Sequence, residues 1–468
     1  MEIFKSLIAQ FPGRKKEVGI TLILVFLSLF VLVLSYFIWS KDRVVTGVRI
    51  AGVPVGGLKV DRVEALMTSQ FESSLQKKVI LIYNQRAFSV VLEAIGVKPD
   101  IKGTVAEAYQ IGRNGNVLTK LIQRINVHRR GLNLKLRYYH NQATLDSFYR
   151  LLEASLAIEP IRSNVYVDSL GNVTYSPSRD GKTIERDKLT TMLENAIVQG
   201  EIDRLEIPIQ TIKPALTETE IKKWKLDQVL GIFSTKFNMA LTDRVHNLKI
   251  ASSAINNVII YPGQKFSFNT WVGPRLAETG YKEAPVVLNG ELVPGIGGGV
   301  CQVTSTLYNA VLFSNLKVIS RRNHSLASAY IPLGRDAAVA YDGLDFIFEN
   351  TLNTPILLAT LVEPPYIRVA VLGEKKGWEK VSLETEIIET LPYKIKETLD
   401  PVLTETERIK EQDGKKGYKV KLWRIVRFSD GTVKKYLENT SIYPAQPEKY
   451  KVGKISEWSG RYVPGNSQ

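Results

Sequence analysis

The chain has 468 residues, a net charge of +15 and an apolar fraction of 44%, which suits about three globular domains with buried cores. Its one cysteine excludes an internal disulfide, and one cysteine with four scattered histidines offers no ligand spacing for zinc, so we expect no metal and no cofactor. The basic residues are spread along the chain without interleaved aromatic residues, so they predict no nucleic-acid surface and suit an anionic environment instead.

An uncharged stretch near the N-terminus, residues 18–39, is rich in Leu, Val, Ile and Phe. As a helix it would span about 33 Å at about 1.5 Å per residue, enough for a hydrocarbon core of about 30 Å. Basic residues are slightly more frequent before the stretch than after it, which places residues 1–17 in the cytoplasm. A cleaved signal peptide is the alternative, but the stretch is long for one and no small-residue cleavage pattern follows it. We therefore expect a single-pass protein of the cell membrane with the bulk of the chain extracytoplasmic.

Residues 44–213 predict an α+β region in which short strands alternate with amphipathic helices. The expected helices are 61–74, 104–111, 143–156 and 187–198. The expected strands are 79–83, 88–92, 134–139, 164–167, 173–176 and 205–212. The rhythm of these elements suggests two related units, although no sequence repeat is detectable.

Two further blocks follow the polar boundary at 214–225. Block 226–365 holds most of the loops rich in Gly, Asn and Ser, and block 378–455 alternates in the manner of β-strands. Within the last block, Ser429-Asp430-Gly431 marks a hairpin turn. The predicted fold class is therefore α+β multidomain: a transmembrane helix, an α+β region, a second α+β domain with a helix-borne cysteine, and a β-rich C-terminal module.

The only cysteine, Cys301, lies where Gly297, Gly298 and Gly299 lead into a run with apolar residues at helical spacing. A thiol there would sit in the first turn of a helix, where the exposed N–H groups and the helix dipole favour a thiolate. The glycines would let a substrate backbone approach closely. Together with Gln302, they are therefore candidate binding residues.

His324 and an acidic residue follow Cys301 in chain order, as in the papain and transglutaminase plan. In that chemistry the imidazole takes the thiol proton and later protonates the leaving amine, while the acid orients the ring. Asp336 is our first choice for the acid, and Asp342 and Asp345 are the alternatives. Chain order does not establish that these residues are adjacent. A cysteine that only packs in a core remains the competing interpretation.

Several arginines of the same block are candidates for binding the carboxylates of a peptide or glycan ligand. We select Arg275, Arg322 and Arg335 from a set that also includes Arg244 and Arg321. For each arginine taken singly, a solvated surface position is the simpler interpretation.

The block from Phe233 to about Leu361 resembles the VanW family. The matching motifs are Arg244-Val245-His246-Asn247, Tyr261-Pro262-Gly263-Gln264-Lys265-Phe266-Ser267-Phe268-Asn269, Val272-Gly273-Pro274-Arg275, Gly297-Gly298-Gly299-Val300-Cys301-Gln302-Val303, Arg322-Asn323-His324-Ser325 and Gly334-Arg335-Asp336-Ala337. The segment 79–212 is similar to the peptidoglycan-binding domain that often precedes VanW modules, through Gly112-Arg113-Asn114-Gly115 and Ser178-Arg179-Asp180-Gly181. The segment 382–453 is similar to the five-glycine module of cell-surface proteins, with Gly414, Gly417, Gly431 and Gly453 as its glycines.

The resemblance implies a cell-envelope protein whose partner is peptidoglycan, and it does not by itself name a reaction. Combined with the cysteine, it suggests a cysteine-dependent amide hydrolase or transferase acting on stem peptides. A non-catalytic wall-binding protein and a scaffold that recruits other envelope enzymes are the alternatives.

Overall fold

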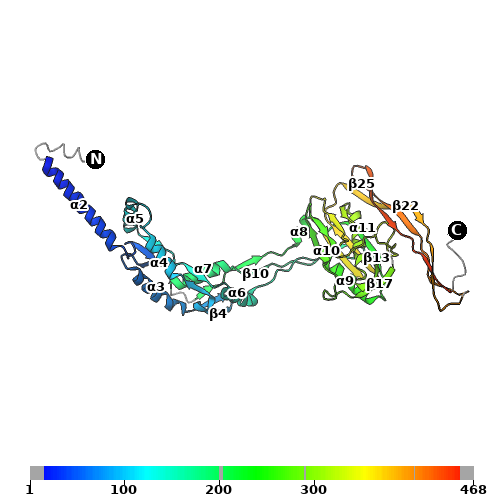
Figure 1. The fold of residues 1–468 in the computed structure, drawn as a ribbon, viewed down its shortest axis with the longest axis horizontal. Coiled ribbons are helices and arrows are strands. Elements are labelled where there is room, and N and C mark those ends of the chain that lie inside the picture. Colours follow the sequence, from blue (N-terminus) through cyan, green and yellow to red (C-terminus); the bar gives the residue numbers. More distant parts are fainter. Residues whose placement is uncertain (1–14, 200–203, 289–290, 405, 454–468) are drawn as a thin grey trace. The chain divides into compact units, whose positions relative to one another are not determined.

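The computed structural model describes residues 15–199, 204–288, 291–404 and 406–453 (Figure 1). The chain divides into two compact units, each described here by itself. Unit 1 contains residues up to Pro160 together with Asp180–Lys213, and unit 2 contains Ile161–Arg179 together with the chain from Pro214 onward. The predicted region 44–213 therefore does not map onto one unit, because residues 161–179 leave unit 1 and join unit 2.

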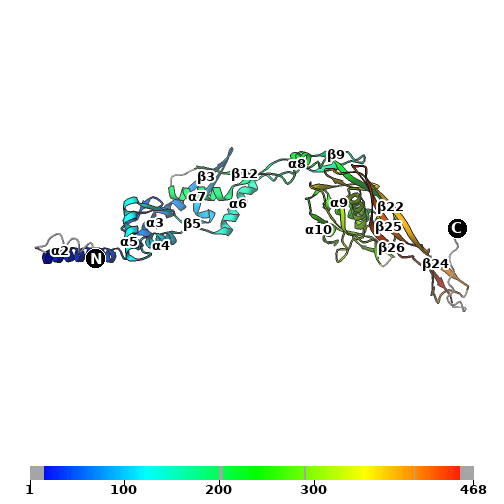
Figure 2. The ribbon, with the colours of Figure 1, turned by 90° about the horizontal axis from the view of Figure 1, so that it is seen from above.

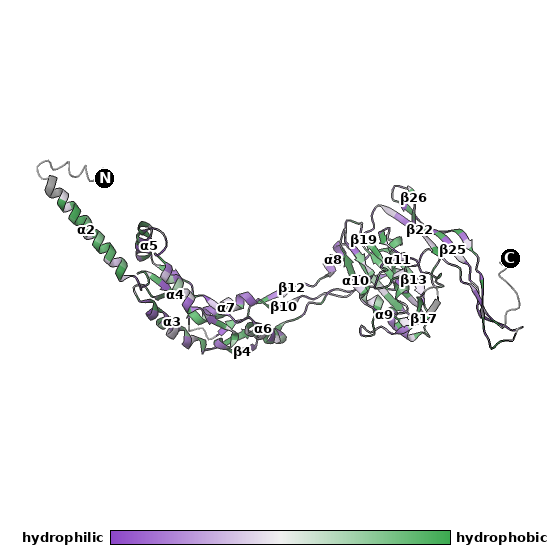
Figure 3. Cartoon of the chain, in the orientation of Figure 1, coloured by the Kyte–Doolittle hydropathy of each residue, from purple (hydrophilic) through white to green (hydrophobic). Residues whose placement is uncertain are grey.

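Unit 1 begins with the long apolar helix α2, Lys15–Trp39, which is hydrophobic along most of its length (Figure 3). Its segment Gly19–Trp39 is the one helix among the described residues that is long and apolar enough to cross a membrane. The predicted cytoplasmic tail, residues 1–17, lies outside the described residues except for the first residues of this helix.

The rest of unit 1 consists of small sheets covered by helices. Its helices are α3 Val60–Leu75, η1 Leu92–Ile95, α4 Ile101–Gln110, α5 Val117–Arg130, α6 Gln142–Leu156 and α7 Arg186–Gln199. Its strands are β1 Val48–Ile50, β2 Val53–Pro54, β3 Lys78–Tyr83, β4 Arg86–Val91, β5 Val97–Pro99, β6 Leu132–Leu134, β7 Tyr138–His140, β10 Gly181–Ile184, β11 Arg204–Glu206 and β12 Ile209–Ile212. The sheets are β2-β1-β6, β11-β3-β4, β5-β7 and β10-β12. One apolar cluster joins these sheets and helices. Helices α3 and α7 each contribute to it a buried face whose apolar residues recur at helical spacing.

Unit 2 is built on the antiparallel sheet β13-β21-β20-β14. The elements up to the end of this sheet are β8 Val165–Val167, β9 Val173–Tyr175, α8 Glu218–Lys223, β13 Val229–Lys236, α9 Thr242–Ile255, β14 Val258–Ile260, β15 Lys265–Ser267, α10 Phe268–Val272, β16 Glu283–Leu288, β17 Glu291–Ile296, α11 Val300–Phe313, β18 Lys317–Ser320, β19 Ile347–Glu349, β20 Ile356–Glu363 and β21 Tyr366–Leu372. Helix α11 contacts β13, β21 and α9 on one side and β22 of the C-terminal module on another. It is therefore the central helix of the unit.

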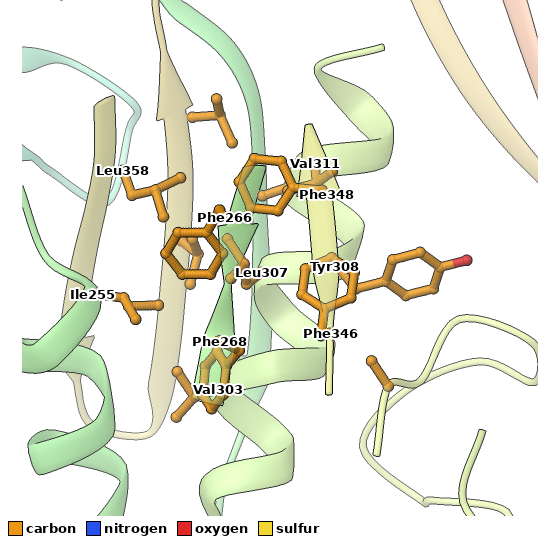
Figure 4. Close-up of a cluster of buried hydrophobic side chains, with 14 of the residues drawn as sticks. Ile255, Phe266, Phe268, Val303, Leu307, Tyr308, Val311, Phe346, Phe348 and Leu358 are labelled. Atoms are coloured by element: carbon orange, nitrogen blue, oxygen red, sulfur yellow. The ribbon is translucent and has the colours of Figure 1, made fainter. Parts of the chain in front are cut away.

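The core around α11 is aromatic (Figure 4). Phe266 and Phe348 lie with ring centroids 5.0 Å apart, and the ring of Tyr308 on α11 meets Phe346 at 5.5 Å. Nearly every residue of α11 is buried, including Gln302, Thr304 and Asn309, and only Cys301 and Phe313 are partly exposed. A helix buried all round is rigid, so it fixes its first turn in place.

The C-terminal module consists of β22 Trp378–Leu391, β23 Ile395–Leu399, β24 Arg408–Gln412, β25 Gly417–Phe428, β26 Val433–Tyr443 and β27 Glu448–Val452. The sheet β22-β25-β26 is antiparallel, and its long strands run side by side in Figure 2, whereas the sheet β23-β27-β24 pairs β23 with β27 in parallel. Leu422 and Val426 of β25 belong to the same apolar cluster as α11. The module therefore shares a core with the preceding domain.

Most predicted elements are present, and three differences have local causes. The expected strand 134–139 is two short strands, β6 and β7, which pair in different sheets. The expected strand 205–212 is likewise split into β11 and β12 around Pro208, which has no N–H to donate to a ladder. Helix α5 was not predicted, although Leu118, Ile122 and Ile125 recur at helical spacing in it, and these side chains are largely exposed instead of facing a core.

Candidate functional site

Cys301 lies in the first turn of α11, directly after the glycine loop that connects β17 to this helix. Gly299 occupies the cap position with φ of 110°, in the left-handed region that favours glycine. The N–H groups of Val300 and Gln302 donate to the loop carbonyls of Gly297 and Gly299. The backbone of the loop thus sets the direction in which the Cys301 side chain projects from the helix.

A β-bridge between two extended segments brings the histidine and the acid together. Arg322 and Ala338 form an isolated antiparallel bridge, so the residues two positions on, His324 and Asp336, lie opposite each other. Asp336 Oδ2 accepts hydrogen bonds from the backbone N–H and from Nδ1 of His324, both at 2.7 Å. The carboxylate therefore fixes both the position and the orientation of the imidazole ring.

The sulfur of Cys301 lies against the same segment. The N–H of Val339 donates to Sγ at 3.4 Å, while the Sγ–H contacts the Val339 carbonyl oxygen at 3.5 Å. The His324 imidazole is close enough to the thiol to lower the pKa of Cys301. Because Nδ1 is occupied by Asp336, Nε2 is the ring nitrogen that remains for the sulfur. The structure thus brings Cys301, His324 and Asp336 together in the order that the sequence suggested.

Burial and charge act in opposite directions on this pair. Burial raises the pKa of the Cys301 thiol, but the His324 imidazole, the Val339 N–H and the Arg275 charge outweigh burial, so the pKa falls below its usual value. Burial lowers the pKa of His324, yet the hydrogen bonds to Asp336 and Cys301 raise it from 6.5 to about 9. Both shifts favour a thiolate facing an imidazolium at neutral pH.

Asp336 is held as a buried anion by groups from two parts of unit 2. Arg321 donates to Oδ1 at 2.8 Å, and the hydroxyl of Tyr443, on β26 of the C-terminal module, donates to the same oxygen. Burial opposes ionisation of the carboxyl, but the bonds from His324 and the charge of Arg321 keep the pKa of Asp336 below its ordinary value. Arg321 in turn donates to Ser441 Oγ at 2.7 Å.

Arg275 has a buried guanidinium with unused donors, and its charge lowers the pKa of the Cys301 thiol. Its two terminal nitrogens are buried and have no hydrogen-bond partner among the described residues, and the same holds for the hydroxyl of Tyr281. Burial lowers the pKa of Arg275, and the electrostatic influence of Tyr281 and Cys301 partly offsets this effect. Unpaired buried donors of this kind suit an anionic ligand.

The glycines are packed against the protein's own chain rather than left open. A Cβ on Gly298 would meet the carbonyl oxygens of Ala284 and Pro285 at 2.5 and 2.7 Å, and one on Gly297 would meet Arg275 Cβ at 3.0 Å. A Cβ on Gly299 would likewise meet Arg244 Cγ at 3.0 Å. This packing explains the glycines without a substrate, and the expected close approach of a substrate backbone stays a prediction. The glycines let the two arginines come close to the loop.

Gln302, proposed as a binding residue, is almost fully buried. Its amide nitrogen donates to Thr235 Oγ1 at 3.1 Å and to the Lys236 carbonyl at 2.9 Å, and its oxygen accepts from Arg244 at 2.9 Å. All of these partners are protein groups, so Gln302 positions Arg244 and is not free to bind a ligand.

The remaining candidates lie apart from the thiol. Arg335 donates to Asn309 Oδ1 at 2.6 Å and stacks over Phe233, about 12 Å along α11 from Cys301 by the helical rise. Arg322 is exposed. Asp345 accepts hydrogen bonds from Ser267 and from the Asn269 N–H at the start of α10, and Asp342 is exposed, so neither alternative acid contacts His324.

Three supporting residues were not selected from the sequence as site residues. Ser305, one turn after Cys301, accepts from the N–H of Ala337 at 2.9 Å and so ties the Asp336 segment to α11. Arg321 and Tyr443 hold the carboxylate. Side chains of an extended segment point alternately to opposite faces, so this pattern along 321–324 could have indicated that Arg321 is buried and Arg322 exposed. No local sequence signal indicates the role of Tyr443. No group of three or more His, Cys, Asp and Glu side chains in the described ranges is arranged to hold a metal ion.

Comparison with known proteins gives three family matches along the chain. Residues 243–372 match the model of the VanW-like proteins, residues 88–206 match a domain family described as peptidoglycan-binding, and residues 382–454 match the G5 domain. The predicted resemblances are thereby confirmed.

Two curated relatives match parts of the chain. The uncharacterized protein YoaR of Bacillus subtilis (strain 168) is 36% identical over 211 residues, covering 45% of this chain and 68% of its own. The vancomycin B-type resistance protein VanW of Enterococcus faecalis (strain ATCC 700802 / V583) is 32% identical over 159 residues, covering 33% of this chain and 58% of its own. The G5 domain of IgA1 protease matches 16% of this chain and 93% of its own, at 23% identity and a TM-score of 0.13.

Proposed function

Because the chain belongs to the VanW family, we propose that this cell-wall-associated protein is a thiol-dependent enzyme that cleaves or transfers amide bonds in the stem peptides of peptidoglycan. The observation that carries the proposal is the arrangement of Cys301, His324 and Asp336. The sulfur faces an imidazole whose other nitrogen is held by a buried carboxylate. A cysteine with only a packing role does not need a buried anion to orient the ring beside it.

The proposed reaction begins with the Cys301 thiolate and the His324 imidazolium. The sulfur attacks the carbonyl carbon of a peptide bond, and the C–N bond breaks as His324 Nε2 gives its proton to the leaving amine. The product is a thioester on Cys301 and a neutral imidazole. That imidazole then removes a proton from water, for hydrolysis, or from an acceptor amine, for transfer, and the thiolate leaves. Asp336 keeps the ring oriented throughout and stabilises its cationic form.

Arg275 supports a substrate that carries a carboxylate. Its terminal nitrogens are buried and unpaired among the described residues, its charge lowers the pKa of the Cys301 thiol, and a buried guanidinium gains a charge-assisted hydrogen bond when a carboxylate binds. Stem peptides offer free carboxylates close to their amide bonds. Among the three arginines selected from the sequence, only Arg275 is retained in this role.

Helix α2 supports a membrane-anchored protein rather than one released by cleavage. Residues at its outer end take part in the fold of unit 1: Ser40 accepts hydrogen bonds from Arg124 through its hydroxyl and from Arg113 through its carbonyl. Arg124 also lies over the ring of Phe37, with 4.6 Å to the centroid. A signal peptide removed after residue 39 would take that ring away. We therefore place the rest of the chain outside the cytoplasmic membrane.

A non-catalytic role in binding or organising the wall is the second candidate. It is favoured by the match of residues 88–206 to a peptidoglycan-binding family and by the G5 match. In this case the VanW domain would hold a wall fragment without breaking a bond, and other envelope enzymes would be its partners.

The test uses purified sacculi and soluble stem peptides incubated with the wild-type protein and with Cys301→Ala. Mass spectrometry detects new amine and carboxyl ends after hydrolysis, or new cross-links after transfer. The enzyme proposal predicts products with the wild type and none with Cys301→Ala, while both proteins sediment equally with sacculi. If neither protein forms products and both sediment with sacculi, the binding role is correct and the enzyme proposal fails.

A further inference from the structure

A cavity of about 520 Å³ lies in unit 1 between α2 and the helices α4 and α5. One wall is apolar and consists of Phe30, Val33, Leu34 and Phe37, which recur at helical spacing on one face of α2. Phe30 is nine residues before Trp39, so this wall extends about 13 Å back along the helix at about 1.5 Å per residue. A ligand in the cavity would therefore lie against the segment that crosses the membrane.

The other wall is basic. Lys41, Arg113, Lys120 and Arg124 line the cavity, and none of the acidic side chains that the structure describes lines it with them. Arg113 uses Nη2 to bind the carbonyls of Ser40 and Arg43, but its Nη1 is buried and has no partner among the described residues. Lys41 and Lys120 form no ion pair within the described part of the chain. The cavity therefore combines an apolar side with unpaired positive charge at the membrane boundary.

Helix α5 has an exposed apolar stripe next to its cavity-facing side. Leu118 is 65% exposed, and Ile122 and Ile125 follow it at helical spacing with about half of their surface exposed. The last turn of the helix adds His128, Arg129 and Arg130. Exposed apolar residues on a basic helix are typical of helices that lie in the membrane interface, and α5 lies beside α2, where such an interface would be.

We propose that this cavity binds an anionic phospholipid of the outer leaflet, with the phosphate held by Lys41, Arg113 and Lys120 and an acyl chain against Phe30 and Leu34 of α2. A lipid matches both walls at once, because its phosphate meets the basic groups and its chain continues along the apolar face. A free phosphate would leave the apolar wall without a ligand. The inference rests on the proposed membrane anchor and is independent of the thiol chemistry.

The test uses the full chain reconstituted in vesicles that contain equal amounts of phosphatidylglycerol and phosphatidylcholine. After extraction in mild detergent, mass spectrometry measures the lipid that remains bound. We expect the wild type to retain phosphatidylglycerol preferentially. The double variant Lys41→Gln with Lys120→Gln should lower that preference about tenfold, because each lysine near a membrane surface contributes to attraction of anionic lipid.

Two controls distinguish lipid binding in the cavity from a general attraction of anionic lipid to positive charge. Lys98→Gln with Lys182→Gln removes the same charge from exposed positions of unit 1 and should leave the preference unchanged. Val117→Trp fills the cavity without changing charge and should remove the bound lipid. Equal retention of both lipids by the wild type would overturn the proposal, as would equal behaviour of the two lysine double variants. Displacement of the lipid by inorganic phosphate alone would also overturn it.

The intact mass of the protein taken from cell membranes shows independently whether α2 is retained. Loss of α2 refutes the anchor, and with it this site. Retention of α2 without any preference for phosphatidylglycerol refutes the lipid site alone.

Discussion

At the scale of single residues, the site depends on how three side chains share protons. The Val339 N–H and the His324 ring both stabilise a negative sulfur, and Asp336 stabilises a positive ring. Each group is buried or partly buried, so each would be costly without its partner. The charges are therefore coupled, and a change at one residue should appear in the titration of the others.

The first prediction concerns the pH dependence of Cys301 alkylation. The lowered thiol pKa should keep iodoacetamide labelling fast below about pH 8, where an ordinary thiol is mostly protonated. His324→Gln removes the largest cause of that lowering, so burial then raises the pKa and labelling at neutral pH should fall about tenfold or more. Stopped-flow or mass-spectrometric labelling rates across pH measure the shift.

His246→Gln is the matched control, since His246 is an exposed histidine of the same unit that bonds the Gly280 carbonyl. Its labelling curve should overlay that of the wild type. Identical curves for both histidine variants would mean that His324 does not activate the thiol. Turnover should depend on pH differently from labelling, because it should fall above about pH 9. There His324 loses the proton that it gives to the leaving amine.

The second prediction concerns Arg275. Arg275→Gln should raise KM about tenfold or more for stem peptides with a free carboxylate, because a charge-assisted hydrogen bond contributes about 1.5–3 kcal/mol. Peptides with an amidated carboxylate should be affected little. Exposed Arg322→Gln serves as the control and should leave KM unchanged. Equal loss for free and amidated peptides would show that Arg275 does not recognise the carboxylate.

At the scale of elements, the glycine loop and α11 form one rigid support. The loop closes against the carbonyls of Ala284 and Pro285, and Asn247 on α9 donates to the carbonyl of Gly298 at 3.0 Å. The helix behind the loop is buried on all sides. The direction of the Cys301 side chain therefore depends on the tight packing of residues that never touch a substrate.

Gly298→Ala tests this support. The new methyl group would meet two carbonyl oxygens well below contact distance, so we expect a loss of about 1–3 kcal/mol in the free energy of unfolding. Thermal unfolding followed by circular dichroism measures it, and cysteine labelling reports any loss of alignment. Gly343→Ala is the control, because nothing lies within 4 Å of the added methyl group. Equal melting temperatures for the two variants would refute the packing argument.

The sequence predicted the helix after the glycines, the thiol in its first turn and Asp336 as first choice of acid. These features depend on local patterns and on chain order, which a sequence displays directly. It did not predict that the glycines pack against Arg244 and Arg275, nor that Gln302 is buried, because such contacts involve elements distant in the chain. The bridge that pairs Arg322 with Ala338 is also a tertiary feature, and it brings His324 opposite Asp336.

At the scale of the whole molecule, the C-terminal module takes part in the site instead of merely following it. Tyr443 on β26 donates to Asp336, Ser441 accepts from Arg321, and the Ile442 carbonyl accepts from Asn323 at 2.9 Å. Three consecutive residues of the last long strand thus hold the segment that carries the histidine. The segment that matches the G5 domain therefore contributes contacts to the candidate site within unit 2.

Tyr443→Phe tests this coupling between domains. Loss of the hydroxyl removes one donor from the buried carboxylate, so Asp336 should hold His324 less firmly and turnover should fall about tenfold, at a cost of about 1 kcal/mol or more in stability. Tyr436→Phe, on the same strand but 40% exposed, is the control and should behave as the wild type. The module-to-site coupling is wrong if both variants keep full turnover and unchanged labelling of Cys301.

The contact between Tyr443 and Asp336 joins residues 107 positions apart in the chain. Because a chain is synthesised from its N-terminal end, Asp336 emerges well before the strand that carries this tyrosine. Until that strand has folded, the buried carboxylate would lack one of its donors, and on the proposed mechanism the thiol would not yet be fully reactive.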